Sequence, residues 1–343
     1  MHFTQLLLQW YAENQRQLPW RGETDPYKIW ISEIILQQTR VVQGYDYYKR
    51  FIERFPTVKV LAQASEEEVL KIWQGLGYYS RARHIHHAAQ TIMTQFQGKF
   101  PSQYKDIRTL KGVGDYTAAA IASMAFQLVY PAIDGNALRV ISRFFGVIED
   151  VGMPKTVKEI TAISENQIDK EHPDLYNQAI MDFGSSVCTP KNPDCENCPL
   201  QRGCYAFAHQ LSTKLPLKEN RVKIKERWFH YFIITNNNKT IVQQRAAKDI
   251  WRGLYEFPLW ESERQEEEET VLAWLSQHYP GRINSGHLTQ QTTSKLTHRI
   301  IYAHFYVIET DSLVKMTENQ QIIPIIQLPT LPFPKSIAQF LHF

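Results

Sequence analysis

The sequence predicts an all-α first domain followed by a second domain that mixes strands with helix. Its length of 343 residues suits two domains of ordinary size. In the first part, apolar residues recur at helical spacing, as in "PYKIWISEIILQQTRVV" and "EEEVLKIWQGLGYYSRARHIHHAAQTI". Later in the chain, short β-rich runs take over. An apolar fraction of 43% is normal for globular chains with proper cores.

The domain boundary is expected in a basic segment, Leu211–Trp228, which reads "LSTKLPLKENRVKIKERW". Pro216, many Lys and Arg residues and little apolar periodicity are typical of an exposed linker. We therefore expect one domain over 1–210 and another over 227–343, joined by a linker over 211–226.

Three segments of the second domain have recognisable patterns. "HYFIITNNNKTIVQQR" predicts a hairpin around Asn236–Asn238, and "HRIIYAHFYVIE" alternates as a strand does. "ESERQEEEETVLAWLSQHY" is expected to begin as an acidic loop and to continue as an amphipathic helix. The predicted fold class is therefore a multidomain α plus α/β protein.

Charge and hydropathy limit where the protein is expected to be located and what it is expected to bind. The formal net charge of +3 is only mildly basic, so a nucleic-acid surface would have to come from a local arrangement. No stretch approaches the roughly 18 apolar residues of a membrane span, and "MHFTQLLLQWYAENQRQL" lacks the basic start of a signal peptide. We expect a soluble protein in a reducing compartment.

All the cysteines of the chain lie in one loop, "CTPKNPDCENCPLQRGC", residues 188–204. A disulfide framework would spread its cysteines through a short secreted domain, so this density indicates a metal site. Only one C-x2-C pair is present, and the wrap is compact, which favours an iron–sulfur cluster over zinc while leaving zinc as the alternative. The four ligands would be Cys188, Cys195, Cys198 and Cys204.

The segment "LKGVGDYTAAAIASMAF" pairs a glycine turn with the start of a small-residue helix. Exposed backbone N–H groups and the positive end of a helix can hold a phosphate. The plainer alternative is an ordinary helix–helix turn. Taken together, the residues of this segment predict a helix-hairpin-helix that grips a DNA backbone without reading its sequence. They are Leu110, Gly112, Gly114, Thr117 and Ala118.

Two carboxylic acids have contrasting sequence environments. Asp134 precedes a helical pattern, so we expect an N-cap whose backbone donors lower its pKa. Glu33 is the single charge in the apolar run "IWISEIIL", so burial should raise its pKa. A plain cap and a surface glutamate are the ordinary alternatives. A pair with opposite shifts would supply a general acid and an anionic stabiliser.

In combination these motifs resemble the MutY adenine DNA glycosylases of the helix-hairpin-helix superfamily, across nearly the whole chain. The resemblance implies a helical glycosylase domain with a [4Fe–4S] cluster on loop 188–204, and a Nudix-like α/β domain after the linker. The matching segments are "LPWR", "SEIILQQTRV", "GLGYYSRAR", "LKGVGDYTAAAI", "AIDGNALRV", "YNQAIMDFGSSVC" and the cysteine loop.

The resemblance implies roles for the carboxylates. Glu33 matches the general acid that protonates adenine N7, and Asp134 matches the group that stabilises the oxocarbenium-like sugar or captures it covalently. The logic parallels glycoside hydrolysis by a carboxylate pair. Tyr116 and Asn136 match positions that support the site.

Further positions of this sequence match groups that handle the DNA. Trp20, Arg21 and Gln178 match the pocket that receives a flipped adenine. Gln38 and Tyr78 match side chains that the family inserts into the base stack, and Thr39 and Leu76 are expected to face the opposite base. The DNA-binding set also includes the hairpin residues Gly112, Val113, Gly114 and Thr117.

The second domain resembles the one with which MutY proteins find 8-oxoguanine, through the stretch "DIWRGLYEFPLWE". The magnesium-binding glutamate box of nucleotide-hydrolysing Nudix domains is absent from the sequence. The family's Phe-Ser-His recognition element corresponds here to Leu296-Thr297-His298. Thr297 and His298 are therefore the expected contacts to 8-oxoguanine.

The predicted activity is excision of adenine opposite 8-oxoguanine or guanine, without strand cleavage. The endonuclease III branch carries a lysine where this chain has Tyr116, so a glycosylase with lyase activity is the first alternative. A non-catalytic iron–sulfur DNA-binding protein is the second. The expected partner is duplex DNA carrying these mispairs, with no membrane, and the expected state is a monomer on the bacterial nucleoid in the cytoplasm.

Overall fold

A computed structural model describes residues 2–219, 224–245, 249–296 and 298–342. The chain forms two compact units. The first unit takes in 2–63 and 84–219, and the second takes in 64–83 together with the described residues from 224 onward. The predicted boundaries at 210 and 227 stay a prediction, since the chain also crosses between the units around 64 and 83.

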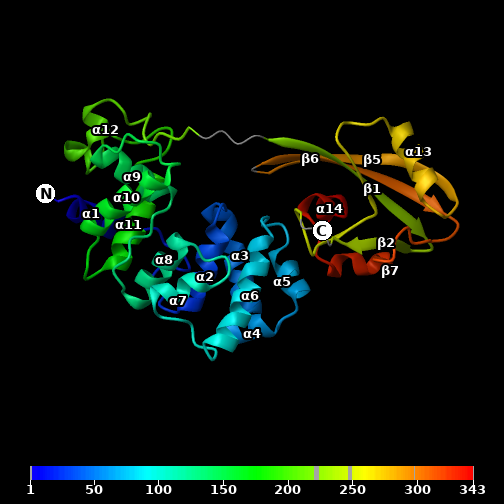
Figure 1. Ribbon diagram of the computed structural model, residues 1–343, viewed down its shortest axis with the longest axis horizontal. Helices are drawn as coiled ribbons and strands as arrows, with labels where there is room; N and C mark the ends of the chain where they lie inside the picture. Colours follow the sequence, from blue (N-terminus) through cyan, green and yellow to red (C-terminus); the bar gives the residue numbers. More distant parts are fainter. Residues whose placement is uncertain (1, 220–223, 246–248, 297, 343) are drawn as a thin grey trace. The chain divides into compact units, whose positions relative to one another are not determined.

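The first unit is built from helices (Figure 1). No helix among the residues that the structure describes is long and apolar enough to cross a membrane. The helices are α1 (Phe3–Asn14), α2 (Pro26–Leu36), α3 (Val41–Arg54), α4 (Val58–Gln63), α6 (Ser80–Gln95, which starts in the second unit), α7 (Tyr104–Thr109), α8 (Asp115–Phe126), α9 (Gly135–Phe145), α10 (Pro154–Gln167), α11 (Pro173–Ser186), the 3₁₀ turn η1 (Gln201–Gly203) and α12 (Tyr205–Ala208).

Helix α2 carries Glu33 and is buried along most of its length, and its ends follow from local chemistry. Asp25 caps it by accepting from the Tyr27 N–H at 2.9 Å, and Pro26 supplies the fixed φ that suits a first turn. The predicted helix from Pro26 to Val42 is interrupted after Leu36. Gln38 adopts a φ of +59°, a left-handed conformation that no helix continues through.

Among the described residues, the second unit is built around a seven-stranded mixed sheet. Its strand order is β3-β2-β1-β6-β5, with β4 paired to β1 and β7 paired to β2; β1 and β6 run parallel and the other pairs are antiparallel. The elements are α5 (Glu66–Trp73), β1 (Lys225–Asn236), β2 (Lys239–Gln244), β3 (Tyr255–Glu256), β4 (Leu259–Ser262), α13 (Glu268–His278), β5 (Ile283–Lys295), β6 (Arg299–Thr310), β7 (Gln320–Pro324), the 3₁₀ turn η2 (Ile325–Thr330) and α14 (Lys335–Phe340).

Alternate residues of strand β1 face two separate cores of this sheet. Phe229 and Tyr231 pack with Ile337 of α14, whereas Phe232 and Ile234 pack with residues of α13. Figure 1 shows these two helices on opposite faces of the sheet. The central strands β1, β2 and β6 are therefore covered on both sides.

The predicted elements of the second domain are confirmed. The hairpin joins β1 to β2 with Asn236 opposite Lys239, and Asn237 and Asn238 both have positive φ, as a two-residue type I′ turn requires. The predicted strand is β6, and the helix after the acidic run is α13.

The predicted helical stretch from Glu66 to Ile92 is divided by a loop. Helix α5 ends at Trp73 and α6 begins at Ser80. In between, Gly75, Gly77 and Tyr78 all have positive φ, of +90°, +79° and +49°. Helical periodicity did not reveal this break, because apolar residues continue through the loop.

Candidate active site

Helices α2 and α8 bring a carboxylic acid and a phenol into direct contact. Glu33 lies on α2, and Tyr116 lies in the first turn of α8. The Tyr116 hydroxyl donates to Glu33 Oε2 at 2.6 Å, and its oxygen lies 3.5 Å from the Met181 sulfur. Asp134, the cap of α9, is near enough to raise the Glu33 pKa. The two acids predicted to act together therefore share one site.

The pKa of Glu33 is raised, as its sequence environment predicted. Its side chain is buried within an otherwise apolar helix, and this loss of solvation is the largest cause. The hydrogen bond from Tyr116 and the charge of Arg21 act in the opposite direction, while the Asp134 carboxylate raises the pKa further. The arrangement favours a protonated acid that can donate its proton.

Asp134 caps α9 as predicted, but the predicted direction of its pKa shift is wrong. Its Oδ1 accepts from the backbone N–H groups of Asn136 and Ala137 at 2.9 and 2.8 Å. These bonds and the Asn136 side chain lower its pKa, but burial raises it by more, so the pKa lies above its usual range. Desolvation of a cap is a tertiary effect, which the local sequence did not reveal.

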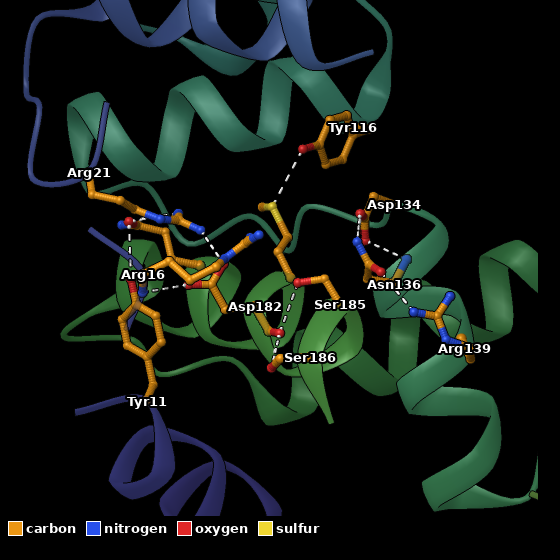
Figure 2. Close-up of polar contacts among 12 residues, drawn as sticks. Tyr11, Arg16, Arg21, Tyr116, Asp134, Asn136, Arg139, Asp182, Ser185 and Ser186 are labelled. Atoms are coloured by element: carbon orange, nitrogen blue, oxygen red, sulfur yellow. Dashed lines mark hydrogen bonds and ion pairs between the residues drawn. The ribbon is translucent and has the colours of Figure 1, made fainter. Parts of the chain in front are cut away.

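Figure 2 shows Asp134, Asn136 and Arg139 joined in a hydrogen-bonded series. The Asn136 amide donates to Asp134 Oδ2 at 2.7 Å, and Arg139 donates to Asn136 Oδ1 at 2.8 Å. Arg139 also donates to the Cys188 carbonyl at 2.7 Å and to the Gly184 carbonyl at 2.6 Å. One buried guanidinium thus joins the cap to the cysteine loop.

Sequence reasoning did not single out Arg139 or Gly184. A Cβ at Gly184 would lie 2.6 Å from the Asn136 Cβ, so only glycine allows this approach of α11 to α9. Arg139 follows Asn136 by three residues, a spacing that places both on one helix face. That spacing is the sequence feature from which the contact between Arg139 and Asn136 could have been predicted.

A second charged cluster surrounds Asp182 of α11 (Figure 2). Arg16 pairs with its carboxylate, and the Arg21 Nη2 atom donates to Oδ1 at 2.6 Å. Arg21 also donates to Gln178 Oε1 at 2.9 Å, and the Tyr11 hydroxyl lies 3.4 Å from that oxygen. The predicted pair Arg21 and Gln178 is therefore in contact.

Asp182, Arg16 and Tyr11 were not predicted as members of the site. Asp182 lies four residues after Gln178, so both side chains share one face of α11. Asp182 is the single acid in the apolar helix stretch "AIMDF", and this sequence feature could have identified it as a buried site residue. Trp20, the third predicted pocket residue, is buried and packs edge-on against Tyr48, with ring centroids 5.3 Å apart.

The predicted hairpin links α7 to α8. Gly112 has a φ of +81°, and a Cβ there would lie 2.7 Å from the His84 Cβ, so the turn needs glycine. Gly114 is the exposed N-cap of α8, so the first N–H groups of that helix have no partner within it. The Val113 side chain is buried. The Thr117 side chain is also buried, where its hydroxyl accepts from the Gln37 amide at 3.2 Å.

The remaining predicted DNA contacts lie in two tight turns. Gln38 is exposed and Thr39 is half-buried in the turn after α2. Tyr78 is 46% exposed in the loop before α6, whereas Leu76 is buried. An exposed tyrosine in a left-handed conformation is unusual, so this position departs from ordinary packing.

The four cysteines are not paired as disulfides, and they line one cavity together. Burial and the neighbouring sulfurs raise the pKa of the Cys198 thiol to about 12. Arg143 holds the loop from the side by donating to the Thr189 and Pro190 carbonyls and approaching the Cys188 sulfur at 3.3 Å. Four converging sulfurs whose charge is unfavourable without a cation fit a bulky group that binds each of them.

Within the described ranges, no group of three or more His, Cys, Asp or Glu side chains is arranged to hold a single metal ion.

Of the two predicted lesion contacts, His298 is exposed, and its carbonyl accepts from the Lys225 N–H at 3.0 Å. Thr297 lies outside the described residues.

Two family models match the chain. Residues 31–170 match the HhH-GPD superfamily base excision DNA repair proteins, and residues 230–343 match the NUDIX domain. Curated relatives match over longer ranges. The adenine DNA glycosylase of Buchnera aphidicola from Schizaphis graminum is 38% identical and aligns with 80% of this chain and 78% of its own. That of Buchnera aphidicola from Baizongia pistaciae is 33% identical, with 99% and 97% aligned.

Solved structures resemble the helical part. A thermostable thymine-DNA glycosylase superposes with a TM-score of 0.57 at 27% identity, over 60% of this chain and 95% of its own. Endonuclease III in a non-covalent complex with DNA gives a TM-score of 0.53 at 22% identity, over 61% and 94%. The second likeness shows the fold alone.

Proposed function

Because the chain belongs to the adenine DNA glycosylases of base excision repair, we propose that it hydrolyses the N-glycosidic bond of adenine opposite 8-oxoguanine or guanine in duplex DNA. The product is free adenine and an abasic site. The observation that carries this proposal is the buried contact between Tyr116 and Glu33 beside the capped Asp134. Binding DNA would require neither a buried acid nor a second carboxylate next to it.

Glu33 acts as the general acid. Burial keeps its carboxyl protonated to higher pH, so it can deliver a proton to adenine N7 and convert the base into a neutral leaving group. The Tyr116 hydroxyl donates to Oε2, which leaves the other carboxyl oxygen to carry the proton. Positioned acids of this kind contribute about 10²–10⁴-fold to rate.

Asp134 stabilises the positive sugar that forms as the bond breaks. In its ionised form the carboxylate is held by two backbone N–H groups and by the Asn136 amide. Either an ion pair with the sugar or a transient covalent bond to it fits a carboxylate pair of this kind. Asn136 is a positioning residue in this scheme, because Arg139 fixes its amide.

The adenine must leave the base stack before these groups reach it. Arg21, Gln178 and Trp20 are proposed to line its pocket, with Arg21 oriented by Asp182. Gln38 and Tyr78 would fill the gap left in the stack, and Thr39 and Leu76 would face the opposite base. The hairpin Gly112–Gly114 and the first N–H groups of α8, that of Thr117 among them, would hold the phosphate backbone.

The cysteine loop is proposed to hold a [4Fe–4S] cluster through Cys188, Cys195, Cys198 and Cys204. Such a group supplies a rigid cross-link among four points of a loop that otherwise has little regular structure. In the second unit, Thr297 and His298 are proposed to recognise 8-oxoguanine, whose N7 hydrogen and C8 oxygen distinguish it from guanine. A monomer would carry every one of these groups.

One assay with two readouts tests the proposal. Protein is incubated with a duplex containing a single A:8-oxoguanine pair, and strand cleavage is scored before and after alkali. We expect cleavage only after alkali, because position 116 is a tyrosine and offers no amine for a Schiff base. Cleavage without alkali, accompanied by a borohydride-trapped complex, would show a lyase instead. A duplex in which T replaces A should remain intact.

A further inference from the structure

The loop that carries Tyr78 is hydrogen-bonded to the C-terminal segment of the second unit, residues 331–333. Helix α5 and residues 74–79 belong to that unit although the strands follow some 150 residues later. A few polar contacts join α5 and this loop to residues 331–333. Those contacts connect a proposed DNA-probing side chain to the Nudix-like fold.

The Tyr79 hydroxyl is the central contact. It accepts from the Gly75 N–H at 3.1 Å and donates to the Phe333 carbonyl at 3.3 Å. The side chain is only 4% exposed, so neither bond is easily exchanged for water. One oxygen therefore joins the backbone of the loop to the backbone of the C-terminal segment.

Two further side chains reinforce this contact. The Gln74 side-chain oxygen accepts from the Phe333 N–H at 3.4 Å and from Lys71 Nζ at 3.1 Å. Lys71 also donates to the Leu331 carbonyl at 3.0 Å, and burial lowers the pKa of its ammonium group. Phe333 itself is fully buried against Phe257 in the core of the sheet. The loop is thus attached to a rigid part of the unit.

Contacts among the loop residues hold the conformation of the loop, while the attachment holds its place. Gly75, Gly77 and Tyr78 have positive φ, which for Tyr78 is a strained conformation that its surroundings must maintain. Inside the loop, Trp73 Nε1 and Arg81 donate to the Gly77 carbonyl, and the Arg81 guanidinium lies over the Tyr78 ring at 5.3 Å. The exposed Tyr78 ring is held in one pose by buried neighbours.

We propose that Tyr79 is a positioning residue for Tyr78, and that the Nudix-like unit takes part in probing the base stack by holding this loop through Phe333. The proposal rests on the function given above, in which Tyr78 enters the stack. It adds a second role for the Nudix-like unit, separate from the lesion contacts proposed for Thr297 and His298. Holding the ring in its inserted pose beforehand reduces the entropy that binding would otherwise cost.

The test variant is Tyr79→Phe in the full chain, and Tyr279→Phe is its matched control. The Tyr279 hydroxyl also donates to a carbonyl, that of Ser312 at 3.0 Å, and also accepts from a backbone N–H, that of Val314 at 3.2 Å. It is likewise 4% exposed and in the same unit, but at the end of α13. Both variants remove one hydroxyl and, with it, the two hydrogen bonds described for it.

Binding is measured on an A:8-oxoguanine duplex whose target sugar carries a 2′-fluorine, which resists hydrolysis, with 2-aminopurine next to the 8-oxoguanine to report unstacking. We expect Tyr79→Phe to weaken binding about 5- to 20-fold and to reduce the fluorescence gain, as the loss of one or two hydrogen bonds implies. Tyr279→Phe should bind as the parent does. Lys71→Met should shift both readouts in the same direction as Tyr79→Phe.

A double-mutant cycle with Tyr78→Ala separates positioning from general loss of structure. If Tyr79 acts through Tyr78, adding Tyr79→Phe to Tyr78→Ala changes binding no further. An additional loss in that background, or a Tyr79→Phe protein indistinguishable from Tyr279→Phe, overturns the inference. So does full binding by Tyr78→Ala. Failure of the parent protein to release adenine would instead overturn the proposed function.

Discussion

Glu33 shows at the scale of one residue how function and stability oppose each other. Its carboxyl is buried among apolar side chains, so its pKa in the folded protein exceeds that in the unfolded chain. The folded state therefore binds the proton more tightly. The stability gained in this way is complete below the unfolded pKa, about 4.3, and is lost as pH rises through the folded pKa. At higher pH, ionised Glu33 destabilises the fold.

Glu33→Gln is therefore expected to stabilise the protein at pH 8 while it removes the proposed acid. A neutral amide of the same shape can still accept the Tyr116 hydrogen bond and carries no buried charge. The gain in Tm should shrink as pH falls toward about 4.3, where the parent residue is protonated too. Thermal unfolding followed across this range measures it, with the exposed Glu13→Gln as control. A gain that is the same at every pH would contradict this account.

The same substitution and Asp134→Asn should each reduce adenine release by about 10²–10⁴-fold. Proton donation and charge stabilisation act in the transition state, so binding to the uncleaved duplex should change little. Single-turnover excision assays and equilibrium binding on the same duplex measure the two effects. Near-parental excision by either variant would remove that residue from the proposed mechanism.

Some properties of the site residues could be predicted from the neighbouring sequence, and others could not. The cap by Asp134 followed from an aspartate before a helix, and the shift of Glu33 followed from a charge in an apolar run. The raised pKa of Asp134 depends on burial by other elements. The pairing of Arg21 with Asp182 joins residues 161 positions apart, which no local pattern encodes.

At the scale of elements, α9 links the cysteine loop to the site through Arg139. This buried side chain donates to the carbonyls of Gly135, Gly184 and Cys188 and to the Asn136 amide oxygen. Arg143, one turn later, donates to the carbonyls of Thr189, Pro190 and Leu215 but not to Asn136. The two arginines therefore allow the effects of the loop and of the site to be separated.

We expect Arg139→Lys to lower adenine excision about 10-fold or more, because an ammonium group cannot reproduce the planar set of donors. Arg143→Lys should lower iron and sulfide content to a similar or greater degree, yet change excision per cluster-loaded molecule much less. Metal analysis beside single-turnover assays on the same preparations measures both. Equal excision per loaded molecule in the two variants would argue against the Asn136 connection.

Element boundaries were the least predictable feature of the helices before the linker. Apolar spacing ran through residues 26–42 and 66–92, and each stretch is broken by a turn with positive φ. Gln38 and Tyr78 occupy these turns, although neither is a residue that favours such a conformation. Strain at exposed positions is common where side chains have a binding role, so the failed helix predictions coincide with the proposed DNA contacts.

At the scale of the molecule, the all-α and α/β architecture was predictable, because each half has one dominant periodicity. The membership of Ala64–Arg83 in the second unit was not predictable, since it depends on contacts across the chain. The proposed division of labour places catalysis on the helices and lesion recognition beyond the linker. This division makes a quantitative prediction about substrate preference.

A Thr297→Ala/His298→Ala variant should lose preference for A:8-oxoguanine over A:G while its A:G activity stays near the parental value. A hydrogen bond to a base edge is worth about 1–3 kcal/mol, which corresponds to roughly 5- to 150-fold in preference. Excision rates on the two duplexes measured side by side give the ratio. Retention of the full ratio would place recognition before the linker, near Leu76 and Tyr78.

The hydrogen bond between Tyr79 and Phe333 also has a consequence during synthesis. The two residues are 254 positions apart in the chain. A ribosome adds roughly 5–20 residues per second, so Tyr79 is made roughly 10–50 s before its acceptor. Helices form within microseconds, and the nascent helical unit therefore has ample time to fold first. A chain still being translated would then meet DNA before its Tyr78 loop is hydrogen-bonded to Phe333. It would bind a mispair with full affinity only after release of the C-terminal segment.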